Sequence, residues 1–287
     1  MGLAGRLLLG FLEVAPEREL SRVVGRLASL PAPVAVRTFA SLYGVAVDEA
    51  EHPLDAYPSL LAFFTRRLKA GVRPVDPDPD VIVSPVDGVL DVSGRVEAGA
   101  LVQAKGHRYD VAALLAVSPE SDEARRYRDG VFATLYLSPR DYHRTHCPAD
   151  AEVVAVRYVP GDLMPVNANA VSSVSSLFTR NERVVVELES ARFGRMAYVM
   201  VGATCVGRMK LAFDARIMTN VRGAELREHH YEPRIPLAKA AELGVFELGS
   251  TVVLVMEPGV ELARERGPIR MGERLAMRMG ERVARRR

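Results

Sequence analysis

The sequence predicts an α+β fold, in which a compact sandwich-like or barrel-like β core carries peripheral helices and follows an N-terminal amphipathic helical region. Three observations lead to this fold class. The first 70 residues have helical patterning punctuated by prolines, and short β-branched or alternating runs follow from Val81 onward. Glycine, proline, asparagine or aspartate separates most of these runs, and the runs do not alternate with helices as they do in βαβ units.

Residues 1–70 are predicted to form amphipathic helices. Arginines alternate with apolar side chains there, and the segment from Pro58 to Lys69 begins with a proline, which is favoured in the first turn of a helix. This pattern is typical of helices that pack on the protein's own core and of helices that lie in a membrane interface, and alone it favours the first. No apolar run approaches the roughly 20 residues of a transmembrane helix, and a small-residue secretory cleavage site is lacking.

A stiff, proline-rich connector from Arg73 to Asp80 follows, so the predicted domains are residues 1–70 and residues 71–287. Within the second domain, strands are predicted over 81–83, 131–137, 151–159, 183–188, 196–201 and 251–256. Helical interruptions are predicted over 111–117, 119–127 and 236–243. The segment 261–287 carries nine arginines against four glutamates and is predicted to be a solvated tail, with contact to acidic phospholipid as the alternative.

The composition excludes several classes of protein. The chain has 287 residues, of which 48% are apolar, and a formal net charge of +2, so it is neither disordered nor collagenous nor a many-pass membrane protein. Its 38 Lys and Arg residues are balanced by 36 Asp and Glu residues, and no nucleic-acid partner is expected. Two cysteines cannot form a disulfide framework, which makes a reducing cytosolic setting the default.

Three segments combine reactive side chains with turn residues. The first places Asp87 before Gly88 in a turn after a strand, and the second holds His143 and His146 after a strongly apolar strand. Histidine is the side chain best suited to general acid–base catalysis near neutral pH. The third places Ser250 after a glycine, directly before another apolar strand. Taken singly, the Asp-Gly and Gly-Ser pairs are interpreted as ordinary turns.

Taken together, Asp87, His146 and Ser250 supply a carboxylate, an imidazole and a hydroxyl in the chain order that one class of serine protease uses. One hypothesis is therefore a serine hydrolase acting on lipids or peptides, although a Gly-x-Ser-x-Gly elbow is lacking. A second is that Ser250 attacks the carbonyl of Gly249, because glycine removes the steric barrier to that approach. A third is a non-catalytic membrane-binding module in which these motifs are turns.

Two further chemistries are weaker. His143 and His146 have a spacing compatible with zinc, but a third ligand at a helical or hairpin spacing is lacking unless His229 or His230 supplies it, and no metal is predicted. Cys147 follows His146 directly, and adjacent residues of an extended segment point to opposite sides. A direct cysteine–histidine catalytic pair is therefore not expected.

The motifs resemble those of the phosphatidylserine decarboxylase family, specifically its bacterial Leu-Gly-Ser-Thr type. The resemblance rests on Leu248-Gly249-Ser250-Thr251, on Asp141-Tyr142-His143-Arg144-x-His146 and on Ser84-Pro-x-Asp87-Gly88. Supporting segments fall in collinear order between residues 60 and 260, and several independent motifs in one order make coincidence improbable.

The resemblance implies a proenzyme that cuts itself once, between Gly249 and Ser250, into a beta chain of residues 1–249 and an alpha chain of residues 250–287. By analogy, His146, oriented by Asp87, takes the proton of Ser250, and Ser250 becomes a covalent N-terminal pyruvoyl cofactor. That group forms a Schiff base with the substrate amine and accepts electrons as CO₂ leaves. His143 is the candidate acid for decarboxylation of phosphatidylserine to phosphatidylethanolamine, a step of phospholipid biosynthesis.

The resemblance also changes the interpretation of residues 1–70. Two acyl chains keep phosphatidylserine in the bilayer, so these helices are expected to dock peripherally on the anionic cytoplasmic face of the cell membrane. Arg180 and Arg183 are candidates for contact with the lipid phosphate, and a purely structural role is equally compatible with their positions. A homodimer is compatible with the family, although the sequence does not specify one.

Overall fold

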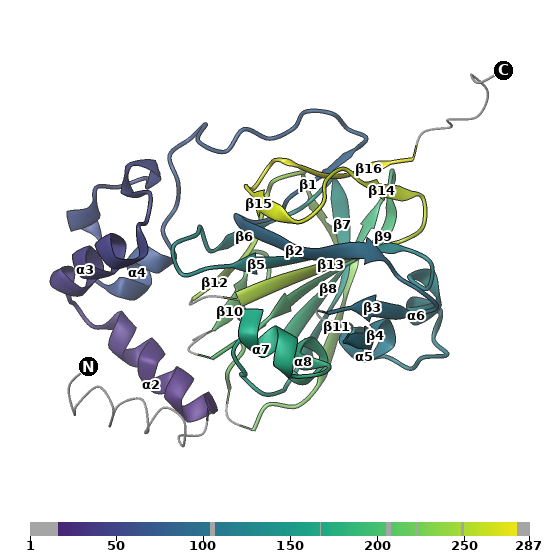
Figure 1. The fold of residues 1–287 in the computed structure, drawn as a ribbon, viewed down its shortest axis with the longest axis horizontal. Coiled ribbons are helices and arrows are strands. Elements are labelled where there is room, and N and C mark those ends of the chain that lie inside the picture. The colour runs from purple at the N-terminus through teal and green to yellow at the C-terminus, as the bar shows by residue number, and fades with distance from the viewer. Residues whose placement is uncertain are drawn as a thin grey trace.

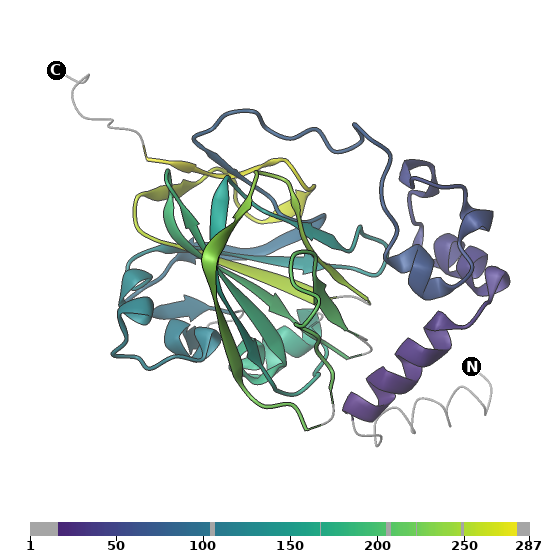
Figure 2. The same cartoon turned by 180° about the vertical axis from the view of Figure 1, so that it is seen from behind.

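The computed structural model describes residues 17–103, 107–166, 168–204, 208–221, 223–247 and 250–279. It has the predicted α+β fold, with a group of N-terminal helices beside a large β core (Figure 1). In the view from behind, the same helices again lie to one side of the strands (Figure 2). No helix of the described residues is long and apolar enough to cross a membrane.

The N-terminal helices have a small hydrophobic core of their own. The helices are α2 (Glu17–Ser29), α3 (Pro33–Tyr43) and α4 (Leu60–Phe64), and the short 3₁₀ turns η1 (Val47–Glu49) and η2 (Leu54–Ala56) connect α3 to α4. Val36, Ala40 and Phe63 are buried together in this core. The predicted helix over Pro58 to Lys69 is shorter than expected, because Ser59 caps its first turn and the chain leaves the helix after Phe64.

The centre of the molecule is one antiparallel sheet of eight strands in the order β11-β7-β8-β9-β13-β5-β2-β15. Its two edges are β11 and β15, so the sheet is open and does not close into a barrel. Strand β13 lies in the middle, paired with β9 on one side and with β5 on the other. The strands are β2 (Gly88–Arg95), β5 (Val131–Leu137), β7 (Ala151–Val159), β8 (Arg183–Ser190), β9 (Gly194–Val201), β11 (Arg227–Leu237), β13 (Ser250–Met256) and β15 (Gly267–Ile269).

Three smaller sheets and four short helices complete the core. The small sheets have the orders β1-β16-β14, β10-β12-β6 and β3-β4. Their strands are β1 (Val81–Val83), β3 (Ala100–Val102), β4 (Arg108–Asp110), β6 (Arg144–His146), β10 (Met209–Leu211), β12 (Glu242–Phe246), β14 (Val260–Leu262) and β16 (Arg274–Arg278). The helices are α5 (Val111–Leu115), α6 (Asp122–Arg126), α7 (Ala168–Ser173) and α8 (Leu177–Arg180).

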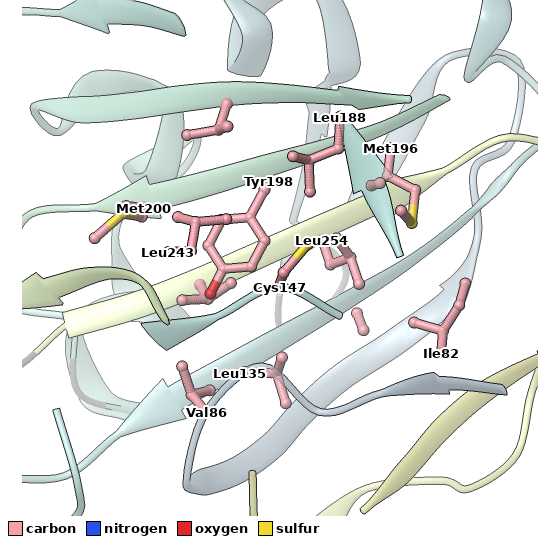
Figure 3. Packing of buried hydrophobic residues seen from close by; sticks show 14 of the residues in the cluster. Ile82, Val86, Leu135, Cys147, Leu188, Met196, Tyr198, Met200, Leu243 and Leu254 are labelled. Carbon is pink, nitrogen blue, oxygen red and sulfur yellow. The ribbon is translucent and has the colours of Figure 1, made fainter. Parts of the chain in front are cut away.

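The large sheet has a hydrophobic core on each face, which makes the architecture sandwich-like. Along β13, Val252 and Leu254 belong to one core, whereas Val253 and Val255 belong to the other, as the two-residue period of a strand requires. The first core lies between the large sheet and the small sheets, and Figure 3 shows Leu254 of β13 packed there with Leu243 of β12 and other neighbours. The second core is covered by α5, α8 and the β3-β4 pair.

Two expectations about the C-terminal third were wrong. Residues 236–243 are not helical: Leu237 ends β11 in register with Ala151, Ala240 has a left-handed φ of 63°, and β12 begins at Glu242. Pairing with neighbouring strands prevails here over a local helical pattern. Residues 261–279 are not a solvated tail either, because they contribute β15 and β16 and bury Leu275 completely. Residues 280–287 lie outside the described residues.

Candidate active site

Strand pairing brings the three sequence motifs to one end of the large sheet. Ser250, the first residue of β13, is in register with Leu137, the last residue of β5. On the other side of β5, Val89 is in register with Tyr136, so Gly88 lies beside Leu137. Neighbouring strands are about 4.8 Å apart, which places the backbones of Gly88 and Ser250 about 10 Å from each other across β5.

Gly88 is required by the close approach of β2 to β5. A Cβ atom at this position would lie 2.2 Å from the carbonyl oxygen of Tyr136. No side chain fits at that distance, so the Asp-Gly pair of the sequence is a packing requirement and not only a turn. The tight contact holds the preceding residue, Asp87, at the end of the sheet.

The histidine-bearing strand β6 joins this arrangement through the backbone. His146 is in register with Glu242 of β12, and its N–H donates to Pro85 O at 2.9 Å. Phe246 N–H, at the far end of β12, donates to His143 O at 3.0 Å. The strand that carries the histidines is therefore bonded both to the loop before Asp87 and to the strand that leads toward Ser250. Gly249 lies outside the described residues, and for Ser250 the backbone alone is described.

The Asp87 carboxylate is buried in an ion pair with Arg73. Arg73 Nε donates to Oδ1 at 2.9 Å, Arg73 Nη2 donates to Oδ2 at 2.5 Å, and Met271 N–H donates to Oδ1 at 2.9 Å. Arg73 Nη2 also bonds Glu49 at 2.6 Å. Burial by itself would lower the pKa of Arg73, but its hydrogen bonds to the two carboxylates raise that pKa above its ordinary value. Arg73 therefore remains a guanidinium and bridges Asp87 and Glu49.

His146 is buried and held by two partners other than Asp87. Its Nδ1 lies 2.8 Å from Ala240 O, and its Nε2 lies 3.2 Å from the Tyr142 hydroxyl. Because a carbonyl oxygen only accepts, Nδ1 carries the proton and Nε2 accepts from the phenol. Burial lowers the pKa of His146, against the opposing effect of the Ala240 hydrogen bond and of the negative charges of Glu242 and Asp87. The ring is therefore a neutral base at pH 7, with its lone pair on Nε2.

The resemblance implies that Asp87 orients His146, and the described residues show no hydrogen bond between these two side chains. Ala240 and Tyr142 orient the ring, and the influence of Asp87 on it is electrostatic. Burial raises the pKa of Tyr142 to about 12, so its phenol stays protonated and remains a donor. This arrangement differs from a serine-protease triad, in which the carboxylate accepts a hydrogen bond from Nδ1–H.

His143 has a different environment from His146. The side chain is completely buried, its Nδ1 lies 2.9 Å from Asp141 O, and its ring centroid lies 4.0 Å from that of Phe64. Its Nε2 is buried without a hydrogen-bond partner among the described residues. Burial lowers the pKa of His143 to about 3. Because Nδ1–H donates to Asp141 O, the lone pair is on Nε2, and the low pKa keeps the ring neutral near pH 7, so Nε2 must receive a proton before it can act as an acid.

The other candidate residues from the sequence make contacts that hold the fold together. Arg183 is buried and donates to the carbonyl oxygens of Leu114 and Thr179, while Arg180 pairs with Asp162 at the surface. Burial raises the pKa of the Cys147 thiol to about 12, which makes it a poor nucleophile. His229 lies against Tyr231 in β11, and the described residues contain no group of three or more metal-ligating side chains.

The sequence did not identify Arg66 and Arg73 as part of the site. The buried Arg66 guanidinium donates to the carbonyl oxygens of Arg140 and Asp141, in the loop that carries His143. Arg66 lies in the predicted helical segment from Pro58 to Lys69, within one of the motifs that support the resemblance, whereas Arg73 begins the polar connector and resembles an ordinary surface residue there. Tyr142 was within a quoted motif, but its contact with His146 depends on the bend of the chain after β5.

Comparisons with known proteins agree on one family. The family model described as phosphatidylserine decarboxylase matches residues 60–284. A protein of Anaeromyxobacter sp. (strain K), named phosphatidylserine decarboxylase proenzyme, is 48% identical over 262 residues, covering 88% of this chain and 90% of its own. Relatives with the same name are 44% identical in Myxococcus xanthus, covering 86% and 88%, and 40% identical in Brevibacillus brevis, covering 88% and 89%.

Proposed function

Since the chain belongs to the phosphatidylserine decarboxylase family, we propose that it removes CO₂ from phosphatidylserine with a pyruvoyl group made from its own Ser250. The family makes the protein a decarboxylase that is synthesised as a zymogen. The proposal adds the position of the cut, between Gly249 and Ser250, the covalent cofactor and the residues that act on both.

The observation that carries the proposal is the state of His146. Its Nδ1–H is bonded to Ala240 O, which places the lone pair on Nε2, and its strand pairs with the strand that leads to Ser250. The Tyr142 hydroxyl, which donates to Nε2, has to give way when Nε2 accepts the proton of Ser250. A neutral imidazole with a lone pair of this kind is a general base at neutral pH. Ser250 lies at the start of β13, one of the two central strands of the sheet, which explains how a cut there would leave both fragments bound.

The cut proceeds by the chain's own groups. His146 Nε2 takes the proton of Ser250 Oγ, and Oγ attacks the carbonyl carbon of Gly249. The peptide C–N bond breaks as the C–O ester bond forms, and the nitrogen receives the proton. Loss of the Ser250 Cα proton then expels the Gly249 carboxylate. Water hydrolyses the resulting enamine, after it becomes an imine, to a pyruvoyl group and ammonia.

The start of β13 offers polar groups that fit a carbonyl cofactor. Ser138 Oγ and His143 Nε2 are buried without hydrogen-bond partners among the described residues, and Ser138 directly follows Leu137, the register partner of Ser250. A pyruvoyl group supplies an electrophilic carbonyl for the substrate amine and an electron sink for decarboxylation. The proton that reaches the carbon that CO₂ has left passes through His143 Nε2, which has no other hydrogen-bond partner among the described residues.

We also propose that α2 and the segment after it dock the enzyme on the cytoplasmic face of the cell membrane. Val23 and Leu27 lie one helical turn apart on α2, and Val34 follows at the start of α3, and all three side chains are exposed. Apolar side chains exposed in one stripe on a helix are typical of an interfacial anchor. Such an anchor would bring the site to a substrate that stays in the bilayer.

The proposed function is tested with Ser250→Ala. We expect the wild-type protein to give two fragments, of residues 1–249 and 250–287, which remain together under native mass spectrometry because β13 lies inside the sheet. Ser250→Ala should remain one chain and release no CO₂ from phosphatidylserine, whereas the surface variant Ser118→Ala should behave like the wild type. Denaturing mass spectrometry and a CO₂-release assay measure both outcomes.

The same experiment separates the serine-hydrolase hypothesis. A hydrolase would remain uncut, would be labelled at Ser250 by a fluorophosphonate and would release no CO₂. That result, or a wild-type chain that stays intact while decarboxylating, would contradict the proposed pyruvoyl mechanism. A chain that binds liposomes equally well with and without Ser250, and has no turnover, would instead support the non-catalytic module.

A further inference from the structure

A cationic cavity lies between α2 and the small sheet that contains β10 and β12. Its volume is about 250 Å³, and none of the residues proposed for self-cleavage or decarboxylation lines it. In Figures 1 and 2, α2 lies beside the end of the core where β10 and β12 are found. The lining consists of Ser21, Arg22, Gly25, Arg26, Ser29, Leu61, Arg208, Lys210, Asn220 and Glu247.

The charge of this cavity favours an anion. Four of the lining side chains are cationic, and the one carboxylate, Glu247, is already paired with Lys210. Arg26 and Arg208 have no ion-pair partner among the residues that the structure describes. Two guanidinium groups facing one small cavity offer several N–H donors to a single tetrahedral anion, which is the geometry that phosphate recognition uses.

The cavity is also close to the proposed reaction centre. Glu247 lies on its wall, and Ser250 follows only three residues later. Because consecutive Cα atoms are about 3.8 Å apart, the Cα atoms of Glu247 and Ser250 are at most about 11 Å from each other. In phosphatidylserine only a two-carbon linker separates the reacting amine from the phosphate ester oxygen. An arginine side chain from the cavity can therefore reach the phosphate of a lipid whose amine is at Ser250.

We propose that this cavity, with Arg26 and Arg208 as its main donors, binds the phosphodiester of the phosphatidylserine headgroup. The inference rests on the proposed function, because it assumes that the amine reacts at Ser250. The substrate carboxylate is the less suitable ligand, since a cation paired with it would stabilise the ground state and oppose the loss of CO₂. A phosphate keeps its charge throughout the reaction, so the same pairing holds substrate and product without that penalty.

The position of the cavity on α2 agrees with a ligand that remains in the bilayer. Arg22, Gly25, Arg26 and Ser29 recur at helical spacing and form the side of α2 that lines the cavity. Val23 and Leu27 follow Arg22 and Arg26 in the sequence and are exposed on the adjacent side of the same helix. One helix thus presents donors to a headgroup and apolar side chains to the acyl region beside it.

Arg26→Gln and Arg208→Gln, separately and together, test the proposal in the full-length, self-cleaved protein. We expect the double variant to be cleaved normally and to have a KM for phosphatidylserine in neutral detergent micelles that is raised about 10- to 100-fold, with a much smaller change in kcat. Arg208→Lys should retain part of the affinity. Arg192→Gln is the matched control and should behave like the wild type. It removes an exposed arginine that pairs with Asp80 and does not line the cavity.

Binding of soluble probes gives a readout that does not depend on turnover. By calorimetry, glycerophosphoethanolamine, which has the phosphodiester but no acyl chains, should bind the wild type and should bind the double variant at least about 10-fold more weakly. Inorganic phosphate is the second probe. If phosphate binds as tightly as the diester and leaves the KM for lipid unchanged, the cavity is a free-phosphate site and the proposal is wrong.

Vesicles of phosphatidylglycerol distinguish a headgroup site from general attraction to an anionic surface. The double variant should still bind these vesicles, because the exposed apolar side chains of Val23 and Leu27 are unchanged. Loss of vesicle binding with an unchanged affinity for glycerophosphoethanolamine would assign the arginines to the bilayer surface and overturn the proposal. A wild type that neither cleaves nor releases CO₂ would instead refute the proposed function, so the two failures are distinct.

Discussion

The two histidines of the site are three residues apart, but their surroundings give them different chemistry. His146 has a hydrogen-bond partner at each ring nitrogen, whereas His143 Nε2 has none among the described residues. A base that acts once on Ser250 benefits from a fixed tautomer, which Ala240 supplies to His146. A group that exchanges protons with a substrate needs an open nitrogen, which His143 has. We therefore propose that His146 serves maturation and His143 serves decarboxylation.

This division of labour predicts the behaviour of His143→Gln. The variant should still be cleaved between Gly249 and Ser250, because His146 is unchanged, but its rate of CO₂ release should fall about 100-fold or more. Denaturing electrophoresis measures the cleavage, and a CO₂ assay measures the turnover of the cleaved protein. The exposed His230→Gln serves as the control. Failure of His143→Gln to mature would show that one histidine cannot be assigned to each reaction.

Burial of His143 also predicts acid sensitivity. Its pKa is about 3 in the folded protein against about 6.5 when unfolded, so the folded state binds fewer protons between these values. Stability from this group is present above pH 6.5 and is lost as the pH falls toward 3. Between pH 7 and pH 4.5 the wild type should lose about 2 to 3 kcal/mol more unfolding free energy than His143→Gln, measured by urea denaturation. Equal losses would contradict a neutral, buried His143.

At the scale of elements, the site depends on the register of three adjacent strands. The pairs Ser250 with Leu137 and Val89 with Tyr136 align the ends of β13, β5 and β2, and a slip of one residue would turn every side chain of a strand to the other face. Gly88 sets this alignment on one side, through its contact with Tyr136. Of the proposed catalytic residues, Asp87 directly precedes β2, Ser250 begins β13, and the two histidines follow β5.

Gly88→Ala is therefore predicted to damage both stability and maturation. The added Cβ would meet Tyr136 O at 2.2 Å, so β2 must move away from β5, at a cost of about 3 kcal/mol in unfolding free energy, and self-cleavage should slow as Asp87 is displaced. Gly94→Ala in the same strand is the matched control. Its Cβ would lie 3.7 Å from the Phe132 ring, an ordinary contact, so stability should change by less than about 1 kcal/mol. Equal effects would show that register at Gly88 is unimportant.

At the scale of the whole molecule, buried arginines connect the helical region to the β core. Arg73 joins Glu49 of η1 to Asp87, and Arg66 joins the segment after α4 to the loop that carries His143. Removing one partner of a buried ion pair costs several kcal/mol, so these links fix the position of the helices relative to the site. Arg66 and Arg73 lie on either side of the predicted boundary at residue 70, and their hydrogen bonds link the two predicted domains. The helices also retain a small core of their own.

Membrane binding is also a property of the whole molecule, and we expect it to depend on the exposed apolar side chains of α2. Val23→Asp together with Leu27→Asp should weaken binding to phosphatidylglycerol vesicles by about 10-fold or more, because exposed apolar side chains no longer enter the interface. The unfolding free energy should change by less than about 0.5 kcal/mol, because both side chains are exposed. The extent of self-cleavage should equal that of the wild type within experimental error. Val75→Asp, exposed in the connector, is the control in a vesicle sedimentation assay. Unchanged binding of the double variant would place the docking surface elsewhere.

The sequence by itself determined the fold class, most of the long strands and the identity of the family. These depend on local information: alternation along β5 and β7, turn residues between strands, and motifs such as that of Tyr142 to His146. It predicted wrongly where local pattern and tertiary pairing conflict. Residues 236–243 have a helical pattern, but strand partners at Ala151 and His146 satisfy their backbone in β11 and β12.

Only the tertiary structure decided which groups touch. Asp87 and His146 were both named from the sequence, yet Asp87 is paired with Arg73, and His146 is held by Tyr142 and Ala240. The cavity between α2 and β10 likewise unites residues about 180 positions apart in the chain, from Arg26 to Arg208. Such contacts arise because hydrogen bonds and charges act over a few ångströms in space, whereas a sequence pattern records only separation along the chain.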